Sequence, residues 1–270
     1  MTKTDQALKQ EVHDFWDRES CGTNVTDQPK FSRAYFDEIE AYRYQVEPEI
    51  PEFAQFPDGD GKRVLEVGIG AGTDFLQWVR GGARVIGMDY TREAIKNVSH
   101  RLTVYEEEAP LLQADAENLP FCKNSFDLVY SWGVIHHTPG TWKALDEIIR
   151  LVRPGGRVKL MLYNRHSVCA LAVWIRYALF AGKPWRSVSW ALHHHVESLG
   201  TKGYTLDEIK RQLHSRQVSG LAIKSLPTFY DRVHSAQSWK GRGLIRLTQA
   251  VARVLGWHRE GWFILIEFTK

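Results

Sequence analysis

The sequence predicts an α/β fold in which a parallel, doubly wound sheet is covered by helices on both faces. From Arg63 to Asn164, short apolar segments alternate with amphipathic ones, as expected when each buried strand is followed by a helix. A glycine-rich turn, Gly68 to Gly72, comes directly after the first apolar segment, where folds of this class bind nucleotides. These two observations carry the prediction.

The first 60 residues are predicted to form a helical segment ahead of the sheet. Apolar side chains recur at helical spacing over residues of about 5–18 and 31–45. Three prolines and a DGDGK turn then interrupt the chain before Arg63, so neither helix is expected to continue into the first strand. In folds of this type such a segment often covers the ligand, and we expect residues 1–60 to form a lid.

Residues 61–164 are expected to contain the repeating core. The expected strands are the apolar runs RVLEVG, RVIGMDY, PLLQAD, FDLVYSWG and RVKLMLYN. The expected helices between them are TDFLQWVRGG, TREAIKNVSHRL and TWKALDEIIRLV. The glycine pairs Gly81-Gly82 and Gly155-Gly156 are expected to mark helix ends, where a left-handed residue often closes the last turn.

The alternation stops after Asn164. Residues 165–204 are predicted to be an insertion after the fifth strand, with an apolar part, VCALAVWIRYALFAG, and a polar part, ALHHHVESLGTKGYT. Residues 205–270 are expected to complete the core with a helix capped by Thr205 and Glu208, strands in LAIKSLPTF and GWFILIEFTK, and a helix around Leu244 to Leu255 between them. No repeat or Gly/Ser linker divides the chain, so one domain overall is expected.

The glycine-rich turn has the spacing G-x-G-x-G, with Glu66 two residues before Gly68. Its third glycine, Gly72, falls one position earlier than in the G-x-G-x-x-G turn of dinucleotide sites, so the spacing argues against NAD. Gly68 and Gly70 allow the backbone to pass close to a ligand, and free N–H groups at the start of the next helix can bind its carboxylate. Glu66 can hold an ammonium group of the same ligand.

Further candidate residues lie at the ends of the next two predicted strands. Asp89 ends the second strand, where a carboxylate can bind both ribose hydroxyls, and Tyr90 beside it can pack on adenine. Asp115 and Ala116 follow the third strand, where they can meet the adenine amino group and a ring nitrogen. Because the carboxyl ends of parallel strands lie along one edge, these residues are expected at a single site.

The motifs VLEVGIGAG, GMDY, ADAENLPFCKNSFDLVYSWGVIHH and LVRPGGRVKLMLY together resemble those of class I S-adenosylmethionine-dependent methyltransferases, in particular the type 11 group. The resemblance runs from Val64 to Tyr163. It implies a Rossmann-like sheet of seven strands with the last antiparallel, and S-adenosylmethionine as cofactor. It assigns cofactor contacts to Glu66, Gly68, Gly70, Gly72, Asp89, Asp115 and Ala116. Tyr90 and Trp132, at the ends of the second and fourth strands, complete the predicted cofactor set.

Methyl transfer is an in-line displacement, so the acceptor must be aligned and any proton that it retains must be removed. The fourth strand ends in SWGVIHH, which lacks the N/D-P-P-Y string of adenine-N6 and glutamine methyltransferases and the carboxylates of a catechol-type metal site. We therefore expect metal-independent transfer. His136 and His137 are the first candidates for a base, although one such His in the type 11 group commonly packs structurally.

Other candidate catalytic residues come from more distant segments. Tyr163 ends the fifth strand, and Tyr44 precedes the first strand, where its ring either faces the sulfonium or packs against the sheet edge. The insertion and its exit add four polar candidates: His195, Glu197, Lys202 and Tyr204. The consecutive histidines 193–195 suit a polar loop better than a metal site. Because the insertion leaves directly from the fifth strand, it is favoured over the N-terminal helices as the cover of the acceptor.

Composition and charge limit the class of protein. The chain has 43% hydrophobic and 25% charged residues, three cysteines without a pairing pattern and no long apolar run, so we expect a cytoplasmic globule. Residues 1–164 carry 19 Lys and Arg against 26 Asp and Glu, whereas residues 165–270 carry 16 against 6. The basic half indicates either an anionic surface or substrate, or a solvated face.

Three functions remain open from the sequence. The first is methylation of a small molecule, with the acceptor atom undetermined among S, O, N and C. The second is methylation of a lipophilic acceptor at a membrane surface, favoured by the basic second half and by Trp174, Trp185 and Trp190. The third is a non-catalytic S-adenosylmethionine-binding partner subunit. Nucleic acid is not an expected partner, peripheral membrane contact is compatible with the sequence, and the oligomeric state stays open.

Overall fold

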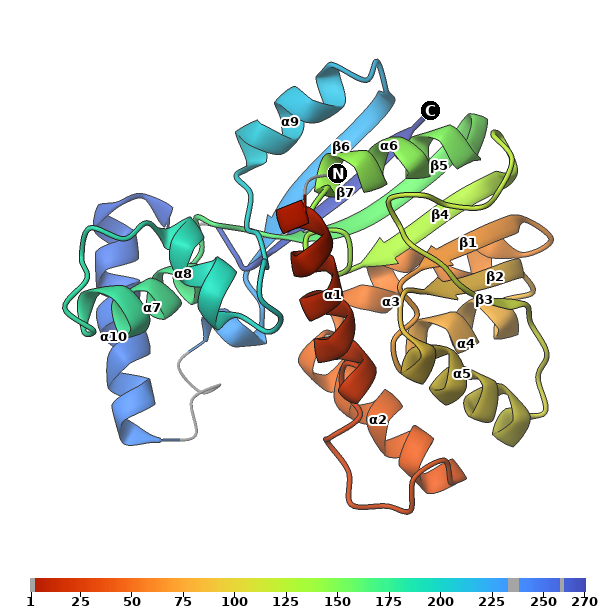
Figure 1. The fold of residues 1–270 in the computed structure, drawn as a ribbon, viewed down its shortest axis with the longest axis horizontal. Helices are drawn as coiled ribbons and strands as arrows, with labels where there is room; N and C mark the ends of the chain where they lie inside the picture. The colour runs from red at the N-terminus through yellow and green to blue at the C-terminus, as the bar shows by residue number, and fades with distance from the viewer. Residues whose placement is uncertain (1–2, 233–237, 258–259) are drawn as a thin grey trace.

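A computed structural model describes residues 3–232, 238–257 and 260–270. These residues build a seven-stranded sheet in the order β3-β2-β1-β4-β5-β7-β6 (Figure 1). The strands are β1 (Arg63–Val67), β2 (Arg84–Asp89), β3 (Leu111–Gln113), β4 (Phe126–Trp132), β5 (Val152–Tyr163), β6 (Ser219–Leu226) and β7 (Phe263–Thr269). Strands β1 to β5 run parallel, and β7 is antiparallel to both of its neighbours. The structure therefore confirms the predicted Rossmann-like sheet.

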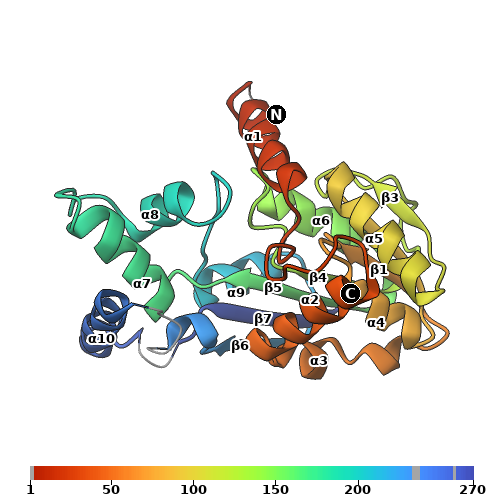
Figure 2. The ribbon, with the colours of Figure 1, turned by 90° about the horizontal axis from the view of Figure 1, so that it is seen from below.

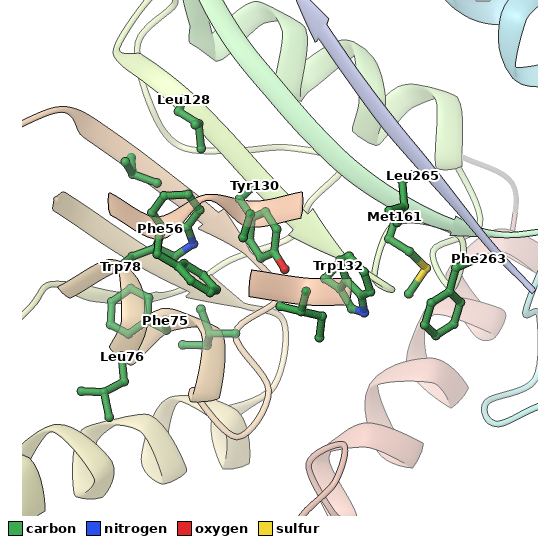
Figure 3. Close-up of a cluster of buried hydrophobic side chains, with 14 of the residues drawn as sticks. Phe56, Phe75, Leu76, Trp78, Leu128, Tyr130, Trp132, Met161, Phe263 and Leu265 are labelled. Atoms are coloured by element: carbon green, nitrogen blue, oxygen red, sulfur yellow. The ribbon is translucent and has the colours of Figure 1, made fainter. Parts of the chain in front are cut away.

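Helices cover both faces of the sheet. They are α1 (Lys3–Arg18), α2 (Arg33–Val46), α3 (Glu49–Ala54), α4 (Thr73–Arg80), α5 (Arg92–Tyr105), α6 (Thr141–Leu151), α7 (Val168–Trp174), α8 (Val188–His195), α9 (Leu206–His214) and α10 (Trp239–Val254). Helices α3, α4 and α5 pack on one face, around the buried aromatic side chains drawn in Figure 3. Helices α6 and α9 pack on the other face.

The strand sequences explain why the sheet is buried on both faces. In β1 the four residues after Arg63 are all buried, and β4 is buried along almost its whole length. Trp78 of α4 lies over β4, with its ring 5.6 Å from the ring of Tyr130 and 4.9 Å from that of Phe56. Continuous apolar runs, rather than alternating ones, are what a two-sided parallel sheet requires.

Three local predictions need correction at their boundaries. The pair Gly155-Gly156 lies inside β5, because α6 ends at Leu151 and the strand begins at the next residue. Strand β6 ends before Pro227, which cannot donate to the sheet. Helix α10 begins at Trp239, five residues earlier than expected, since Ser238 accepts a hydrogen bond from a backbone N–H of its first turn.

The two N-terminal helices are held differently. Helix α2 packs on α5, where the fully buried guanidinium of Arg101 donates to the Phe36 carbonyl and to Glu40, both at 3.2 Å. Helix α1 stands out from the edge of the sheet, between the α7–α8 pair and helices α5 and α6 (Figure 2). Within the lid segment, α2 is therefore anchored to the core and α1 protrudes from it.

The insertion forms a helical unit at one end of the sheet (Figure 1). It contains α7, a π-helical turn called η2 (Ile175–Leu179), and α8. A small separate core, centred on Val168, Leu171, Ile175 and Ala252, joins α7 to α10. Helix α10, which was expected to complete the main core, thus packs against the insertion instead, because its apolar side matches α7.

The predicted capping box of α9 is present. Thr205 accepts the Glu208 N–H at 3.2 Å, and Glu208 accepts the Thr205 N–H at 2.8 Å. We expect Thr205→Ala to lower the free energy of unfolding by about 1 kcal/mol, because it disrupts the two reciprocal hydrogen bonds of the capping box. Urea unfolding measures this. The control is Thr103→Ala on the exposed side of α5, and an equal loss in both variants would contradict the capping role.

Candidate active site

A cavity of about 520 Å³ lies at the carboxyl ends of the parallel strands, the edge where open α/β sheets bind ligands. The ends of β1, β2, β4 and β5 form its floor, and α1 and α2 form one wall. Residues of the insertion form another wall, together with Tyr230 and Trp262. The lid helices and the insertion therefore both border the same space.

Gly68 and Gly70 bring the backbone to this cavity. Both have positive φ, 82° and 48°. A Cβ at Gly68 would lie 2.2 Å from a methyl group of Val134, whereas a Cβ at Gly70 would meet no atom within 4 Å. The chain thus needs glycine at Gly68 for packing, and it leaves open space for a ligand beside Gly70.

Gly72, the third glycine of the turn, lies between the cavity and helix α5. It precedes α4 with a φ of 76°, and it does not line the cavity. A Cβ there would lie 2.7 Å from Val98 of α5. The glycine serves the turn and the packing of α4 on α5, and its predicted contact with the cofactor stays a prediction.

Three carboxylates are buried near this turn. Arg43 pairs with Asp74 at 2.9 Å and with Glu47 at 3.4 Å. Glu66 forms no ion pair among the described residues, and its buried Oε2 has no hydrogen-bond partner there. Burial raises the pKa of Glu66 well above its usual range and that of Glu47 to about 7. Three carboxylates facing one guanidinium favour a cationic ligand, and S-adenosylmethionine carries both an ammonium and a sulfonium.

Asp89 is held in place by neighbouring backbone groups. Its carboxylate accepts the Thr91 N–H at 2.9 Å and the Gly70 N–H at 3.2 Å. Tyr90 lines the cavity beside it and meets the ring of His13 edge-on at 5.1 Å. The end of β2, the glycine turn and α1 therefore converge around one carboxylate.

Asp115 is covered by α1, which the sequence did not predict. Lys9 of α1 forms ion pairs with Asp115 at 2.5 Å and with Glu117 at 3.2 Å. Asp115 and Ala116 line the cavity next to this contact. The protruding helix is thus attached to the sheet edge at the predicted adenine side.

On the opposite side of the cavity, Glu197 and the polar side chains in contact with it form a group that we call the Glu197 cluster. Aromatic rings surround this cluster. Glu197 lies 3.2 Å from His137 Nε2 and accepts the hydroxyl of Tyr163 at 3.1 Å. The other ring nitrogen of His137 contacts the hydroxyls of Ser198 at 3.1 Å and Thr201 at 3.0 Å. Glu197 has a φ of 52°, a left-handed conformation that costs energy for a non-glycine residue. The contacts with His137 and Tyr163 hold it there.

Trp132 and His195 also border the cavity. The indole N–H of Trp132 donates to Glu47 at 3.0 Å, which fixes the ring where β4 ends. His195 is exposed and stacks on Tyr177 with 4.2 Å between ring centroids. It lies at the rim of the cavity, and among the described residues it forms no hydrogen bond or ion pair with the Glu197 cluster.

His136, a candidate base from the sequence, lies outside the residues that line the cavity. It is completely buried, and neither ring nitrogen has a hydrogen-bond partner among the described residues. Its ring packs between those of His137 and Tyr163, at 4.4 Å and 4.0 Å. Burial lowers the pKa of His136 well below its usual range, so it is a neutral packing residue.

Tyr44, Tyr204 and Lys202 also lie outside the residues that line the cavity. Tyr44 donates to Asp74 at 3.3 Å, beneath the lid rather than toward a ligand. Tyr204 packs on Trp142 of α6 at 4.7 Å, and burial raises its pKa to about 12. Lys202 is turned to the carbonyls of residues 138 and 200. All three stabilise segments around the cavity without facing it.

Several cavity residues have no signal in the local sequence. They are Lys9, Trp16, Arg43, Glu47, Tyr230 and Trp262. Arg43 and Glu47 form an ordinary i,i+4 pair on α2, so the sequence indicates an exposed helical ion pair rather than a buried one. Their burial follows from docking α2 over α4, a long-range event.

Residues 3–232, 238–257 and 260–270 lack two further features. There, no group of three or more His, Cys, Asp or Glu side chains is arranged to hold a metal ion. In the same residues, no helix has the length and hydropathy needed to cross a membrane.

The two glycines offer a matched test of the site. Gly72→Ala is expected to lower the free energy of unfolding by about 2 to 4 kcal/mol, because left-handed strain adds to the overlap with Val98. Gly70→Ala is expected to lower the free energy of unfolding by about 1 kcal/mol. It is also expected to weaken S-adenosylmethionine binding at least about tenfold, because the added methyl group enters the open space of the cavity. Urea unfolding and calorimetric titration measure both quantities. Normal cofactor affinity in the folded Gly70→Ala variant would place the ligand elsewhere.

Comparison with known sequences agrees with this site. Residues 65–160 match the family model described as "Methyltransferase domain". The demethylmenaquinone methyltransferase of Clavibacter sepedonicus is 33% identical over 108 residues, 40% of this chain and 44% of that protein. The phthiotriol/phenolphthiotriol dimycocerosates methyltransferase 1 of Mycobacterium ulcerans is 32% identical over 171 residues, 63% of this chain and 57% of that protein. The chain spans about half the length of these relatives.

Solved structures show the same fold. The geranyl diphosphate C-methyltransferase of Streptomyces coelicolor has a TM-score of 0.62 at 16% identity, over 99% of this chain and 98% of that one. A Haemonchus contortus phosphoethanolamine N-methyltransferase bound to S-adenosylmethionine has a TM-score of 0.60 at 17% identity, over 96% and 60%. With the cavity at the carboxyl edge and the matching family model, residues 65–160 form a methyltransferase domain, and the sheet has the fold of the solved S-adenosylmethionine-dependent methyltransferases.

Proposed function

We propose that this chain transfers a methyl group from S-adenosylmethionine to a largely apolar small molecule that carries a hydroxyl group. One observation carries the proposal: a single cavity connects the carboxylates at β1 and β2 to an aromatic region in which Glu197, His137 and Tyr163 meet. Two relatives are named for demethylmenaquinone and for phthiotriol dimycocerosates, names that agree with a lipophilic acceptor.

Residues at the strand ends would hold the cofactor. Glu66 offers an unpaired carboxylate oxygen to the ammonium, and Asp89 offers its carboxylate oxygens to the ribose hydroxyls. Asp115 and Ala116 border the adenine side. When bound, S-adenosylmethionine supplies a methyl group on a positively charged sulfur. The face of an aromatic ring such as Trp132 favours such a cation.

The acceptor region would bind an apolar body and exclude water. Trp16 of α1 meets the ring of His137 edge-on at 5.4 Å, and Trp262 stacks on Tyr163 at 4.2 Å. These rings come from opposite walls of the cavity. Aromatic side chains bury a large area with few rotatable bonds, so they suit a hydrophobic acceptor.

Glu197 is the group that takes the acceptor's proton in this proposal. His137 Nε2 and the Tyr163 hydroxyl hold the carboxylate, and an ionised carboxylate has lone pairs left for a third donor. A carboxylate oxygen of Glu197 thus receives the hydroxyl proton as the acceptor oxygen becomes the nucleophile.

We also propose that the four chain segments divide the work. Residues 1–60 act as a lid, residues 61–164 bind the cofactor, and residues 165–204 cover the acceptor. Residues 205–270 complete the core through α9, β6 and β7. Contacts of α1 and of the insertion with the same cavity support this division.

Removing the carboxylate that is proposed to bind the ribose hydroxyls tests the cofactor part of the proposal. Asp89→Ala is expected to weaken S-adenosylmethionine binding by about 1 to 3 kcal/mol, through loss of charge-assisted hydrogen bonds. Isothermal calorimetry of the folded variant measures this. The control is Asp127→Ala, which removes a carboxylate near the amino-terminal end of β4, opposite to the end that borders the cavity. Unchanged affinity in Asp89→Ala would refute the assignment.

Removing the proton acceptor tests the chemistry. Glu197→Gln is expected to lower kcat by about 10² to 10³, because an amide cannot accept the proton, while cofactor affinity stays within about twofold. Turnover is followed as transfer of labelled methyl to long-chain alcohols, alkylphenols and quinols. Glu108→Gln, an exposed change far from the cavity, is the control. A Glu197→Gln enzyme with full turnover would exclude this residue as the base.

A further inference from the structure

The helical unit at the end of the sheet exposes an unusual amount of apolar surface. Of the eleven large hydrophobic side chains that are exposed among the described residues, seven belong to η2, the turn after it, and α10 with the residue that follows it. They are Leu179, Phe180, Trp185, Trp239, Leu247, Val254 and Leu255. Trp185, Trp239 and Val254 are 74%, 73% and 88% exposed. The other four of the eleven are scattered over separate segments of the described residues, so the apolar side chains gather at this surface.

The same unit carries only positive charge. Residues 165–195 contain four Lys and Arg and no Asp or Glu, and residues 238–257 again contain four and none. Arg176, Lys183 and Arg186 are exposed along η2 and the turn, and Arg246 and Arg253 are exposed on α10. Two segments that contain basic residues and no acidic ones concentrate positive charge at this end of the sequence beyond what solubility requires.

Helix α10 separates these two kinds of side chain. At 100° per residue, Trp239, Arg246 and Arg253 fall on one stripe, and Leu247 and Val254 fall beside it on the exposed side. The opposite side, with Thr248 and Ala252 fully buried, packs toward α7. A helix with an apolar stripe flanked by arginines is typical of segments that lie in the interface of a bilayer.

Both views place the turn after η2 and helix α10 at the same end of the molecule, away from β3 and α5 (Figures 1 and 2). The unit is also connected to the active site, because Cys169 and Val173 of α7 line the cavity while Leu171 and Ile175 face α10. A lipophilic acceptor taken from a membrane at this end would enter next to α7.

We propose that this surface, defined as residues 176–186 with the exposed side of α10, docks the protein on an anionic lipid bilayer. The idea that a lipophilic acceptor enters from the membrane rests on the proposed function, but docking itself does not. Charge complementarity selects the bilayer: lipid phosphates face the arginines, and Phe180, Trp185 and Val254 reach the acyl boundary. A second copy is disfavoured, since a two-fold interface would bring the same cations together.

Vesicle co-sedimentation tests this proposal with the full chain. Phosphatidylcholine vesicles and vesicles with equal phosphatidylcholine and phosphatidylglycerol are compared, without S-adenosylmethionine or acceptor. We expect binding to the anionic vesicles to be at least about tenfold tighter and to weaken as salt is raised. Equal binding to both kinds, or none to either, would overturn the proposal.

Two double variants separate its electrostatic and apolar parts. Arg246→Glu with Arg253→Glu is expected to reduce binding to anionic vesicles at least about tenfold, because each basic residue near the surface contributes separately. Phe180→Ser with Trp185→Ser is expected to reduce it by a similar factor with all cations kept. The controls are Arg84→Glu with Arg92→Glu, at the other end of the sheet, and Leu221→Ser on β6.

The remaining outcomes are also decisive. A loss of binding in the controls as large as in the test variants would show that net charge or general hydrophobicity, not this surface, causes binding. Sedimentation velocity without lipid that shows a dimer broken by Phe180→Ser with Trp185→Ser would assign the surface to a second copy. Vesicle binding without turnover on any acceptor would refute the proposed function and leave the docking surface standing.

Discussion

The ion pair between Arg43 and Asp74 is the interaction on which the arrangement of the cavity depends. The guanidinium donates to both carboxylate oxygens, at 3.1 Å and 2.9 Å, and Asp74 is buried. Tyr130 of β4 donates to the same carboxylate at 2.9 Å. Helix α2, helix α4 and the central sheet therefore meet at one buried charge, and breaking such a pair leaves that charge uncompensated.

This pair also explains the electrostatic character of the cofactor end. Arg43 is shared between Asp74 and Glu47, so it cannot neutralise the nearby Glu66 as well. Burying several carboxylates around one guanidinium costs folding free energy, and the raised pKa values of Glu66 and Glu47 express that cost. A site that is unfavourable in the empty protein and favourable with a cation is a common feature of ligand binding.

The charge distribution divides the molecule into two functional ends. The acidic residues 1–164 contain the strand ends that border the cavity, and the basic residues 165–270 contain the outer helical unit. Helix α7 lies between them, with one side toward the cavity and the other toward α10. A cationic cofactor and an anionic surface would thus be attracted to different ends of the same chain.

The sequence by itself determined the elements and the cofactor edge. Helical and strand periodicity, the G-x-G-x-G turn and the acidic strand ends are local patterns, and a parallel sheet brings strand ends to one edge whatever else the chain does. Predicted residues such as Glu66, Gly70, Asp89 and Asp115 therefore line the cavity.

Only the tertiary structure decided which neighbouring residue faces the ligand and which distant residues join it. His136 and His137 are adjacent, but one is packed in the core and the other borders the cavity. Lys9 reaches Asp115 across 106 positions, and Glu197 reaches His137 from the insertion. These contacts arise when whole helices dock, and docking depends on the summed fit of surfaces that no local spacing encodes.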